Sequence, residues 1–228
     1  FAQTQDAALR LAAACAPRAG LGSGPDSALR IIGSQDTTPR SLFGSSDLLV
    51  VGGGTASGVQ LGQQFFVRRS VAMLDRRAVG FHAVNTVGWV RIAAVNQTTA
   101  IALVDAVCDG IMIGDYLEPY AEPVVPAAAS RADRTGELDF SDPGRVLFGD
   151  DNHSTGGVGR FMVADLGTAR SAAAGSRYAV YRDVRLPGVP LAYVGEAVVV
   201  STEADTSVVR LTLTRDAVTT GDLLVPRR

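Results

Sequence analysis

The sequence Gly88-Trp89-Val90-Arg91-Ile92 is followed, after a polar turn and a second apolar stretch, by Ile111-Met112-Ile113-Gly114-Asp115-Tyr116-Leu117. The same arrangement returns at Gly195-Glu196-Ala197-Val198-Val199 and Ala217-Val218-Thr219-Thr220-Gly221-Asp222-Leu223-Leu224. In each copy a strand pattern follows a glycine, a second strand pattern follows a polar turn, and the copy closes on a Gly-Asp pair. Self-similarity at a fixed spacing is typical of a repeated structural unit. The sequence therefore predicts an internal duplication.

Matched glycines extend the duplication outward from this stretch. The distances within four pairs are 116, 113, 107 and 107 positions, for Gly33/Gly149, Gly62/Gly175, Gly88/Gly195 and Gly114/Gly221. Small changes in spacing fall in loops, where insertions are tolerated. Each copy contains five or six short apolar stretches separated by turn residues, with little helix. This pattern is typical of a small antiparallel barrel or sandwich.

We expect an all-β fold of two tandem homologous small antiparallel barrels or sandwiches, with a short N-terminal helix. Residues 5–15 are mostly strong helix formers, and Pro17 follows them. The expected domains are an N-terminal helix and linker at 1–27, a first barrel at 28–117, a Pro/Ala-rich linker at 118–142 and a second barrel at 143–228. Val124 and Val125 in the linker are expected to pack on a barrel.

The Gly-Asp pairs are expected to form turns. Gly114 and Gly221 precede their aspartates, and glycine adopts a positive φ without steric cost. A short carboxylate such as that of Asp115 or Asp222 readily accepts a hydrogen bond from a neighbouring backbone N–H. We therefore predict that both aspartates are turn residues and not catalytic groups.

Composition argues against two kinds of partner. The net charge is −2, and positive and negative residues are scattered along the chain. Without a basic patch we expect no nucleic-acid partner. No apolar run approaches the roughly 20 residues that span a bilayer, so we expect no transmembrane segment in this chain.

The first residues and the cysteines indicate export. Phe1-Ala2-Gln3 looks like the end of a signal-peptidase site, so we expect a periplasmic or otherwise exported protein whose signal peptide was removed upstream. Cys15 and Cys108 are the two cysteines. One disulfide fits an exported protein, and two buried thiols are the alternative.

A resemblance to known proteins rests on the motif at 88–117 and 195–224, and on the phrase Gly-Asp, strand, proline at 114–119 and 221–226. It resembles the β-rich C-terminal region of bacterial envelope proteins that carry LysM modules, and the C-terminal barrel of the flagellar assembly protein T family. No LysM segment is present, so glycan binding is not carried over. The resemblance implies a periplasmic or envelope accessory protein without an active site.

Residues 47–58 look like the first strand and glycine turn of an FAD- or NAD-binding unit, with Asp75 near the place of a ribose-binding acid. Ser57 stands where the third glycine belongs, and Phe65-Phe66-Val67 follows as a strand pattern and not as a helix. The equivalent stretch at 162–169 lacks the glycine run. Because a turn between two strands explains both copies, the dinucleotide enzyme is kept only as a remote alternative.

No catalytic or metal-binding constellation stands out. His82 and His153, the two histidines, have no nearby Cys or His, whereas zinc needs several such ligands at defined spacing. The sequence contains no Gly-x-Ser-x-Gly elbow. We therefore expect no enzyme activity, no catalytic residue, no metal and no cofactor.

The favoured hypothesis is a non-catalytic, exported accessory subunit that docks on other proteins of a bacterial envelope or membrane complex. Arginine and aromatic side chains are frequent anchors of protein interfaces. The candidates are the arginine pairs Arg68-Arg69 and Arg76-Arg77, together with Trp89, Tyr116 and Tyr120. A peptidoglycan- or carbohydrate-binding module is the alternative, and the sequence leaves the oligomeric state open.

Overall fold

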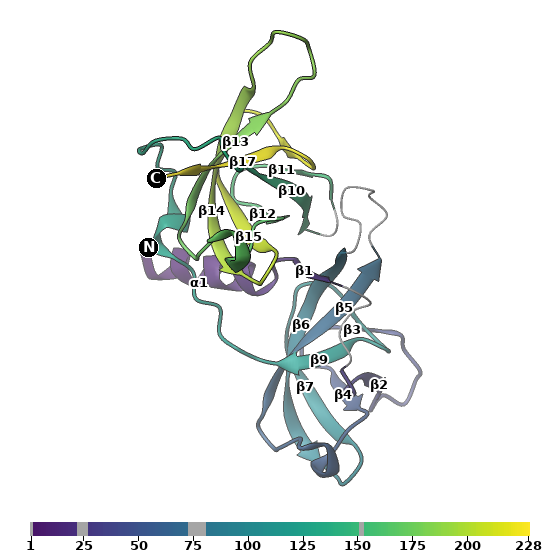
Figure 1. Ribbon diagram of the computed structural model, residues 1–228. Helices are drawn as coiled ribbons and strands as arrows, with labels where there is room; N and C mark the ends of the chain where they lie inside the picture. The colour runs from purple at the N-terminus through teal and green to yellow at the C-terminus, as the bar shows by residue number, and fades with distance from the viewer. Residues whose placement is uncertain (1, 22–26, 73–80, 151–152) are drawn as a thin grey trace. The chain divides into compact units, whose positions relative to one another are not determined.

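The computed structural model describes residues 2–21, 27–72, 81–150 and 153–228 (Figure 1). Within these ranges the chain is built mainly from antiparallel strands. The elements in order are α1 (Ala2–Ala14), β1 (Arg18–Leu21), β2 (Ile31–Ser34), β3 (Leu42–Phe43), β4 (Leu48–Val51), η1 (Thr55–Ser57), β5 (Gln64–Ala72), β6 (Phe81–Val95), β7 (Ala100–Val107), β8 (Ile111–Met112), β9 (Tyr116–Pro119), η3 (Ala127–Ser130), β10 (Gly144–Gly149), β11 (Thr155–Gly156), β12 (Phe161–Ala164), η5 (Thr168–Arg170), β13 (Arg177–Arg182), β14 (Ala192–Thr202), β15 (Ser207–Thr214), β16 (Val218–Thr219) and β17 (Leu223–Arg227).

The chain divides into two compact units. The first unit comprises Ser23–Val71 and Val84–Glu122, and the second comprises Phe1–Gly22, Ala72–Ala83 and Pro123–Arg228. The N-terminal helix and the proline-containing segment after β9 thus belong with the second barrel. None of the helices described is long and apolar enough to cross a membrane.

Six strands of the first unit follow one another in the order β2-β4-β7-β6-β5-β9. The two ends of this path meet through backbone hydrogen bonds, in which Ile31 N–H donates to Asp115 O at 2.9 Å and Leu117 N–H donates to Leu29 O at 2.9 Å. The sheet therefore curls until its first and last strands touch.

The second unit is a closed barrel in the order β10-β12-β15-β14-β13-β17. This order matches that of the first unit strand for strand. The short pairs β3–β8 and β11–β16 also correspond. The expected all-β class with a short N-terminal helix is confirmed.

Register corrects one of the four glycine pairs. Ile31 N–H donates to Asp115 O, and Val146 N–H donates to Asp222 O at the same distance of 2.9 Å. Ile31 therefore corresponds to Val146, and Gly33 corresponds to Phe148 instead of Gly149. Each of these strands has a register irregularity here, between Ile31 and Gly33 and between Val146 and Phe148. Sequence matching on the glycine alone was wrong by one residue.

Each unit encloses its own apolar core. The first core includes Phe65 and Val67, which lie two residues apart on β5. The second includes Val209 and Leu211, which lie two residues apart on β15. Side chains one residue apart in a strand point to opposite faces, so this alternation places one face of each strand inside.

A third cluster covers the outside of the second barrel. Phe161, Val198, Val200 and Val208 form its barrel side, and Leu9 and Ala13 of α1 pack against it. Val125 packs there too, as expected, whereas the same expectation was wrong for Val124, which is 84% exposed. The run from Val198 to Val200 is buried on both faces because α1 and η3 cover what would be the solvent face.

The glycine run at 52–54 is a strand-to-turn connection. β4 pairs antiparallel with both β2 and β7, and the three-residue 3-10 helix η1 follows it. A Cβ on Gly54 would lie 2.1 Å from Asn96 O, and one on Gly167 would lie 2.1 Å from Ala204 O. The glycine thus permits close backbone approach to a hairpin turn. Asp75, invoked in the dinucleotide alternative, lies outside the described residues.

A glycine at a close strand contact gives a first prediction. A Cβ on Gly88 would lie 2.4 Å from Ala106 O, whereas nothing lies within 4 Å of one on Gly33 in the same sheet. We expect Gly88→Ala to lower the free energy of unfolding by about 1–3 kcal/mol, because the backbone must move. Chemical denaturation measures the change.

Gly33→Ala is the matched control. It introduces the same methyl group into open space, so we expect stability to stay within about 1 kcal/mol of the wild type. Equal destabilisation by the two variants would contradict the strand contact described here.

Candidate functional site

An arginine holds the Gly-Asp turn of the first unit. Arg69 of β5 donates two hydrogen bonds to Asp115, from Nε to Oδ1 at 2.9 Å and from Nη2 to Oδ2 at 2.8 Å. The same guanidinium donates to Gly110 O at 2.7 Å and pairs with Asp109 at 3.3 Å. We name this arrangement the Arg–Asp clasp. Its planar fork fixes both the distance and the orientation of the turn.

The second unit contains the same clasp. Arg182 of β13 donates from Nε to Asp222 Oδ1 at 2.9 Å and from Nη2 to Oδ2 at 2.8 Å. It also donates to Ala217 O at 2.6 Å and pairs with Asp216 at 3.0 Å. Every contact therefore has its counterpart in the first unit.

The turn geometry expected from the sequence is confirmed. Gly114 has φ 96° and Gly221 has φ 91°. Asp115 accepts the Met112 N–H at 2.7 Å, and Asp222 accepts the Thr219 N–H at 2.7 Å. Both aspartates are nearly buried, with 5% and 3% of their surface exposed. Arg69 was expected at an interface and pairs with Asp115 instead, while Arg182 was not predicted as a partner of Asp222, although Arg69 and Arg182 have the spacing of Gly62 and Gly175.

Each clasp raises the pKa of its arginine. Hydrogen bonds to Asp115 raise the pKa of Arg69, and hydrogen bonds to Asp222 raise the pKa of Arg182. Both guanidinium groups therefore stay charged in their clasps.

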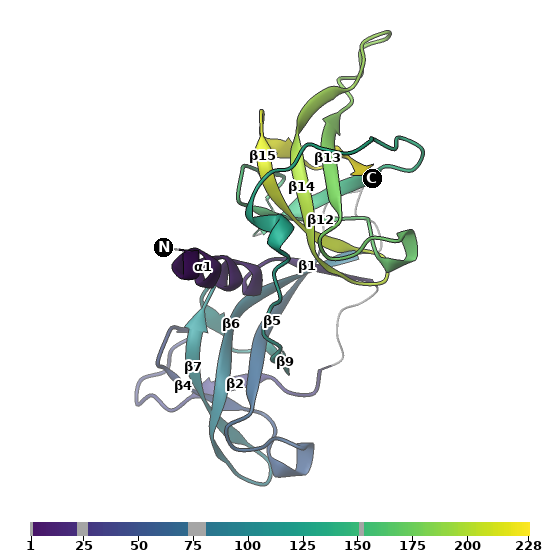
Figure 2. The same ribbon diagram turned by 90° about the vertical axis from the view of Figure 1, so that its left-hand side faces the viewer.

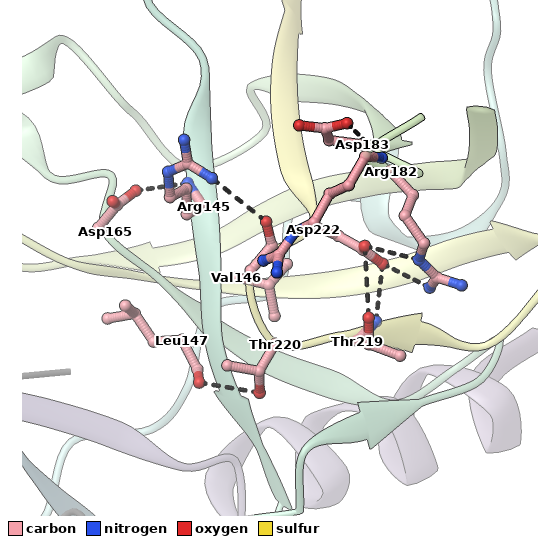
Figure 3. Close-up of a pocket in the computed structure, with 11 residues that line it drawn as sticks. Arg145, Val146, Leu147, Asp165, Arg182, Asp183, Thr219, Thr220 and Asp222 are labelled. Carbon is pink, nitrogen blue, oxygen red and sulfur yellow. Dashed lines mark hydrogen bonds and ion pairs between the residues drawn. The ribbon is translucent and has the colours of Figure 1, made fainter. Parts of the chain in front are cut away.

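A pocket of about 560 Å³ opens beside the second clasp (Figure 3). Its lining includes Arg145, Asp165, Arg182, Asp183 and Asp222. Figure 3 shows the Arg182 guanidinium directed at the Asp222 carboxylate, with Thr219 on the other side of that carboxylate. The buried carboxylate in the pocket wall is thus engaged by the protein itself.

The other polar groups in the lining also bond within the chain. Asp165 accepts the Arg145 backbone N–H and pairs with Arg170 at 3.5 Å, while the Thr220 hydroxyl donates to Leu147 O at 3.1 Å. The described lining contains no histidine or cysteine. In the part of the chain that the structure describes, no group of three or more His, Cys, Asp or Glu residues could hold a metal ion.

An aromatic patch lies on the outer face of the first unit. It consists of Phe66 on β5, Trp89 on β6 and Tyr120 just after β9. The ring centroids are 4.6 Å apart for Phe66 and Tyr120, 6.0 Å for Trp89 and Tyr120, and 6.4 Å for Phe66 and Trp89. Phe66 is buried, whereas Trp89 and Tyr120 are half-buried. We call these three residues the aromatic patch.

The guanidinium group of Arg68 packs against the aromatic patch. The Arg68 guanidinium lies 4.3 Å from the Phe66 ring centroid, donates to Thr86 Oγ1 and pairs with Glu118 at 3.2 Å. Only 4% of Arg68 is exposed. Desolvation raises the pKa of the Tyr120 phenol. The patch is therefore rigid, and its exposed edge consists of Trp89 and Tyr120.

The structure brings together three of the seven interface candidates, because Trp89 and Tyr120 share the aromatic patch and Arg68 packs against its Phe66 ring. Arg69 instead holds Asp115 in the clasp. Tyr116 is only 2% exposed, so its ring is covered within the protein. Arg76 and Arg77 lie outside the described residues.

Both cysteines, Cys15 and Cys108, are disulfide-bonded in the structure. This favours a disulfide over two buried thiols. Comparison with models of known protein families and with curated proteins found no match.

The clasp makes a prediction about stability. Asp222→Asn removes the charge that faces Arg182 in a nearly buried site, so we expect it to cost about 2–4 kcal/mol of unfolding free energy. Denaturant titration of the purified chain measures this cost.

Asp216→Asn is the control, because this second carboxylate contacts the same arginine from a position where its side chain is 69% exposed. We expect a loss of no more than about 1 kcal/mol. A larger loss for Asp216→Asn than for Asp222→Asn would show that the clasp is misassigned.

Proposed function

We propose that this chain is a non-catalytic, exported structural subunit that docks on other proteins of a bacterial cell-envelope or membrane complex. The aromatic patch carries the proposal. Trp, Tyr and Arg are the side chains that most often dominate binding energy at protein interfaces, where they sit on well-packed surroundings. Trp89 and Tyr120 meet this description, because Phe66 and Arg68 hold them in place.

The hydrogen bonds made by the carboxylates of the second unit support a non-catalytic role. A catalytic carboxylate or base needs a proton-transfer partner in reach of a substrate. Asp222 and Asp165 instead accept hydrogen bonds from arginines and backbone N–H groups around the pocket. These carboxylates are already occupied in stabilising turns.

The disulfide-bonded state of Cys15 and Cys108 supports export, because disulfides persist in oxidising compartments such as the bacterial periplasm. A cytosolic chain would be kept reduced. The proposed location is therefore the periplasm or the outer surface of the envelope.

A carbohydrate- or peptidoglycan-binding module is the second candidate. The half-buried rings of Trp89 and Tyr120 favour it, since exposed aromatic faces can stack on sugar rings. The two candidates differ in what the isolated chain binds: glycan in one case, and protein in the other.

Affinity purification with crosslinking from the source cells tests the docking role. We expect Trp89→Ala to reduce recovery of the co-purifying proteins by about thirtyfold, since truncating an anchor residue typically costs about 2 kcal/mol or more. Ile113→Ala, at a 52% exposed position of the same unit, serves as control and should keep wild-type recovery.

Unchanged recovery with Trp89→Ala would rule out the patch as the docking site. Purified cell-wall sacculi provide the second arm. Binding of the isolated wild-type chain to sacculi, lost in Trp89→Ala, would replace protein docking by the glycan-binding role.

Thiol labelling tests the proposed compartment. In cells lysed under denaturing conditions with an alkylating agent, we expect no thiol of this chain to react before reduction and two to react after it. Labelling of both cysteines before reduction would contradict export to an oxidising compartment.

A further inference from the structure

The connection between β13 and β14 exposes an unusual number of aliphatic side chains. Residues 183–191, which we name the apolar hairpin, are all exposed. They include Val184 at 37%, Leu186 at 61%, Val189 at 50% and Leu191 at 36% exposure. Both views show the hairpin projecting away from its own barrel (Figures 1 and 2).

The tip of the hairpin has few free backbone donors. Val189 N–H donates to Leu186 O at 3.1 Å across a turn whose third residue, Gly188, has φ 77°. Proline at the second position and a positive φ at the third match a type II turn. Pro187 and Pro190 have no N–H at all. Such a tip can enter an apolar medium with a small desolvation cost.

Aromatic rings surround the base of the hairpin. Tyr181 and Tyr193 are paired across β13 and β14, and their ring centroids lie 5.6 Å apart. Phe140, which is 48% exposed, adds a third ring 5.3 Å from Tyr181. The Tyr193 hydroxyl donates to Glu196 at 2.7 Å, and burial together with this carboxylate raises the pKa of Tyr193 to about 12. The Tyr193 ring is therefore neutral near pH 7.

Arginines lie both at the base and near the tip. At the base, Arg134 lies 5.3 Å from the Tyr193 ring centroid and Arg215 donates its backbone N–H to Val194 O, whereas Arg185 precedes Leu186 near the tip. Within the ranges that the structure describes, none of these three guanidinium groups has a carboxylate partner. Asp183 is the nearby acid, and its carboxylate accepts the Arg185 N–H at 2.7 Å.

We propose that the apolar hairpin inserts its tip into the interfacial layer of a lipid bilayer that carries anionic headgroups. Aliphatic side chains form the tip with Arg185 among them, and the aromatic rings lie at the base together with Arg134 and Arg215. Arginine keeps its charged head in water while its stem lies along an apolar layer, so this arrangement fits a bilayer interface. The three guanidinium groups, which have no carboxylate partner within the described residues, supply the positive charge that an anionic surface attracts. The tip would reach only the headgroup and upper acyl region, at a depth of about 5–10 Å.

Vesicle co-sedimentation of the full chain tests this inference. We expect binding to vesicles of phosphatidylcholine with about one third phosphatidylglycerol, and weaker binding to phosphatidylcholine alone, because the arginines favour an anionic surface. Leu186→Asp combined with Val189→Asp should reduce the partition coefficient at least about tenfold, since charge is costly in the acyl layer.

Leu61→Asp is the matched control, because Leu61 is a 69% exposed leucine of the first unit. It should bind vesicles like the wild type. Arg185→Gln should weaken binding to the anionic vesicles by about fivefold and leave binding to phosphatidylcholine unchanged. Thermal unfolding of each variant should match the wild type, since the substituted side chains are exposed.

Absence of binding to either vesicle, or wild-type binding by the Leu186/Val189 variant, would overturn the inference. Loss of a co-purifying protein in that variant, without any change in vesicle binding, would overturn it as well and assign the hairpin to a protein partner. Trp89→Ala should bind vesicles normally, so failure of the docking proposal and failure of lipid insertion are distinguishable.

Discussion

The guanidinium groups of Arg69 and Arg182 each hold one nearly buried aspartate through two parallel hydrogen bonds. This contact connects β5 in the first unit, or β13 in the second, to the turn that precedes the last strand, β9 or β17. The turn requires a glycine with positive φ, and the aspartate that follows it accepts a hydrogen bond from the backbone N–H three residues back. The last strand can then pair with β5 or β13 and meet the first strand of its own sheet. Closure of each sheet thus depends on one charged pair.

Much of this architecture could be predicted from the sequence. Three glycine pairs lie at turns or close backbone contacts, where a side chain would not fit, and they are therefore recognisable in the sequence. They are Gly62/Gly175, Gly88/Gly195 and Gly114/Gly221. Arg69 and Asp115 are 46 residues apart, so their contact depends on the strand order and could not be inferred from local pattern. The Gly33 correspondence failed because a register irregularity shifts the strand relative to its glycine. The packing of α1 against Val198 and Val200 is a tertiary contact, and the hydrophobic periodicity of the sequence does not predict it.

The candidate sites could likewise be predicted only in part from the sequence. Trp89 and Tyr120 were recognised from residue type, because aromatic side chains are frequent anchors of protein interfaces. The contact of Phe66 with both rings, and of Arg68 with Phe66, became visible only through the neighbouring strands. Tyr116 has the same residue type as Tyr120 but is nearly fully buried, and residue type alone cannot separate the two. Charged residues around the pocket would suggest chemistry if counted without their hydrogen bonds. Those hydrogen bonds show that Asp165 and Asp222 support the turns of the barrel.

The charged clusters of the two clasps therefore serve the fold, whereas we propose that the exposed rings and the aliphatic tip contact other molecules. A double-mutant cycle in each unit tests this assignment most directly. Arg69→Met and Asp115→Asn form one cycle, and Arg182→Met and Asp222→Asn form the other. The account predicts a favourable coupling energy of about 1–3 kcal/mol in both units of the purified, ligand-free chain. Coupling near zero in either unit would show that the pair is not what holds the turn, and would contradict the account.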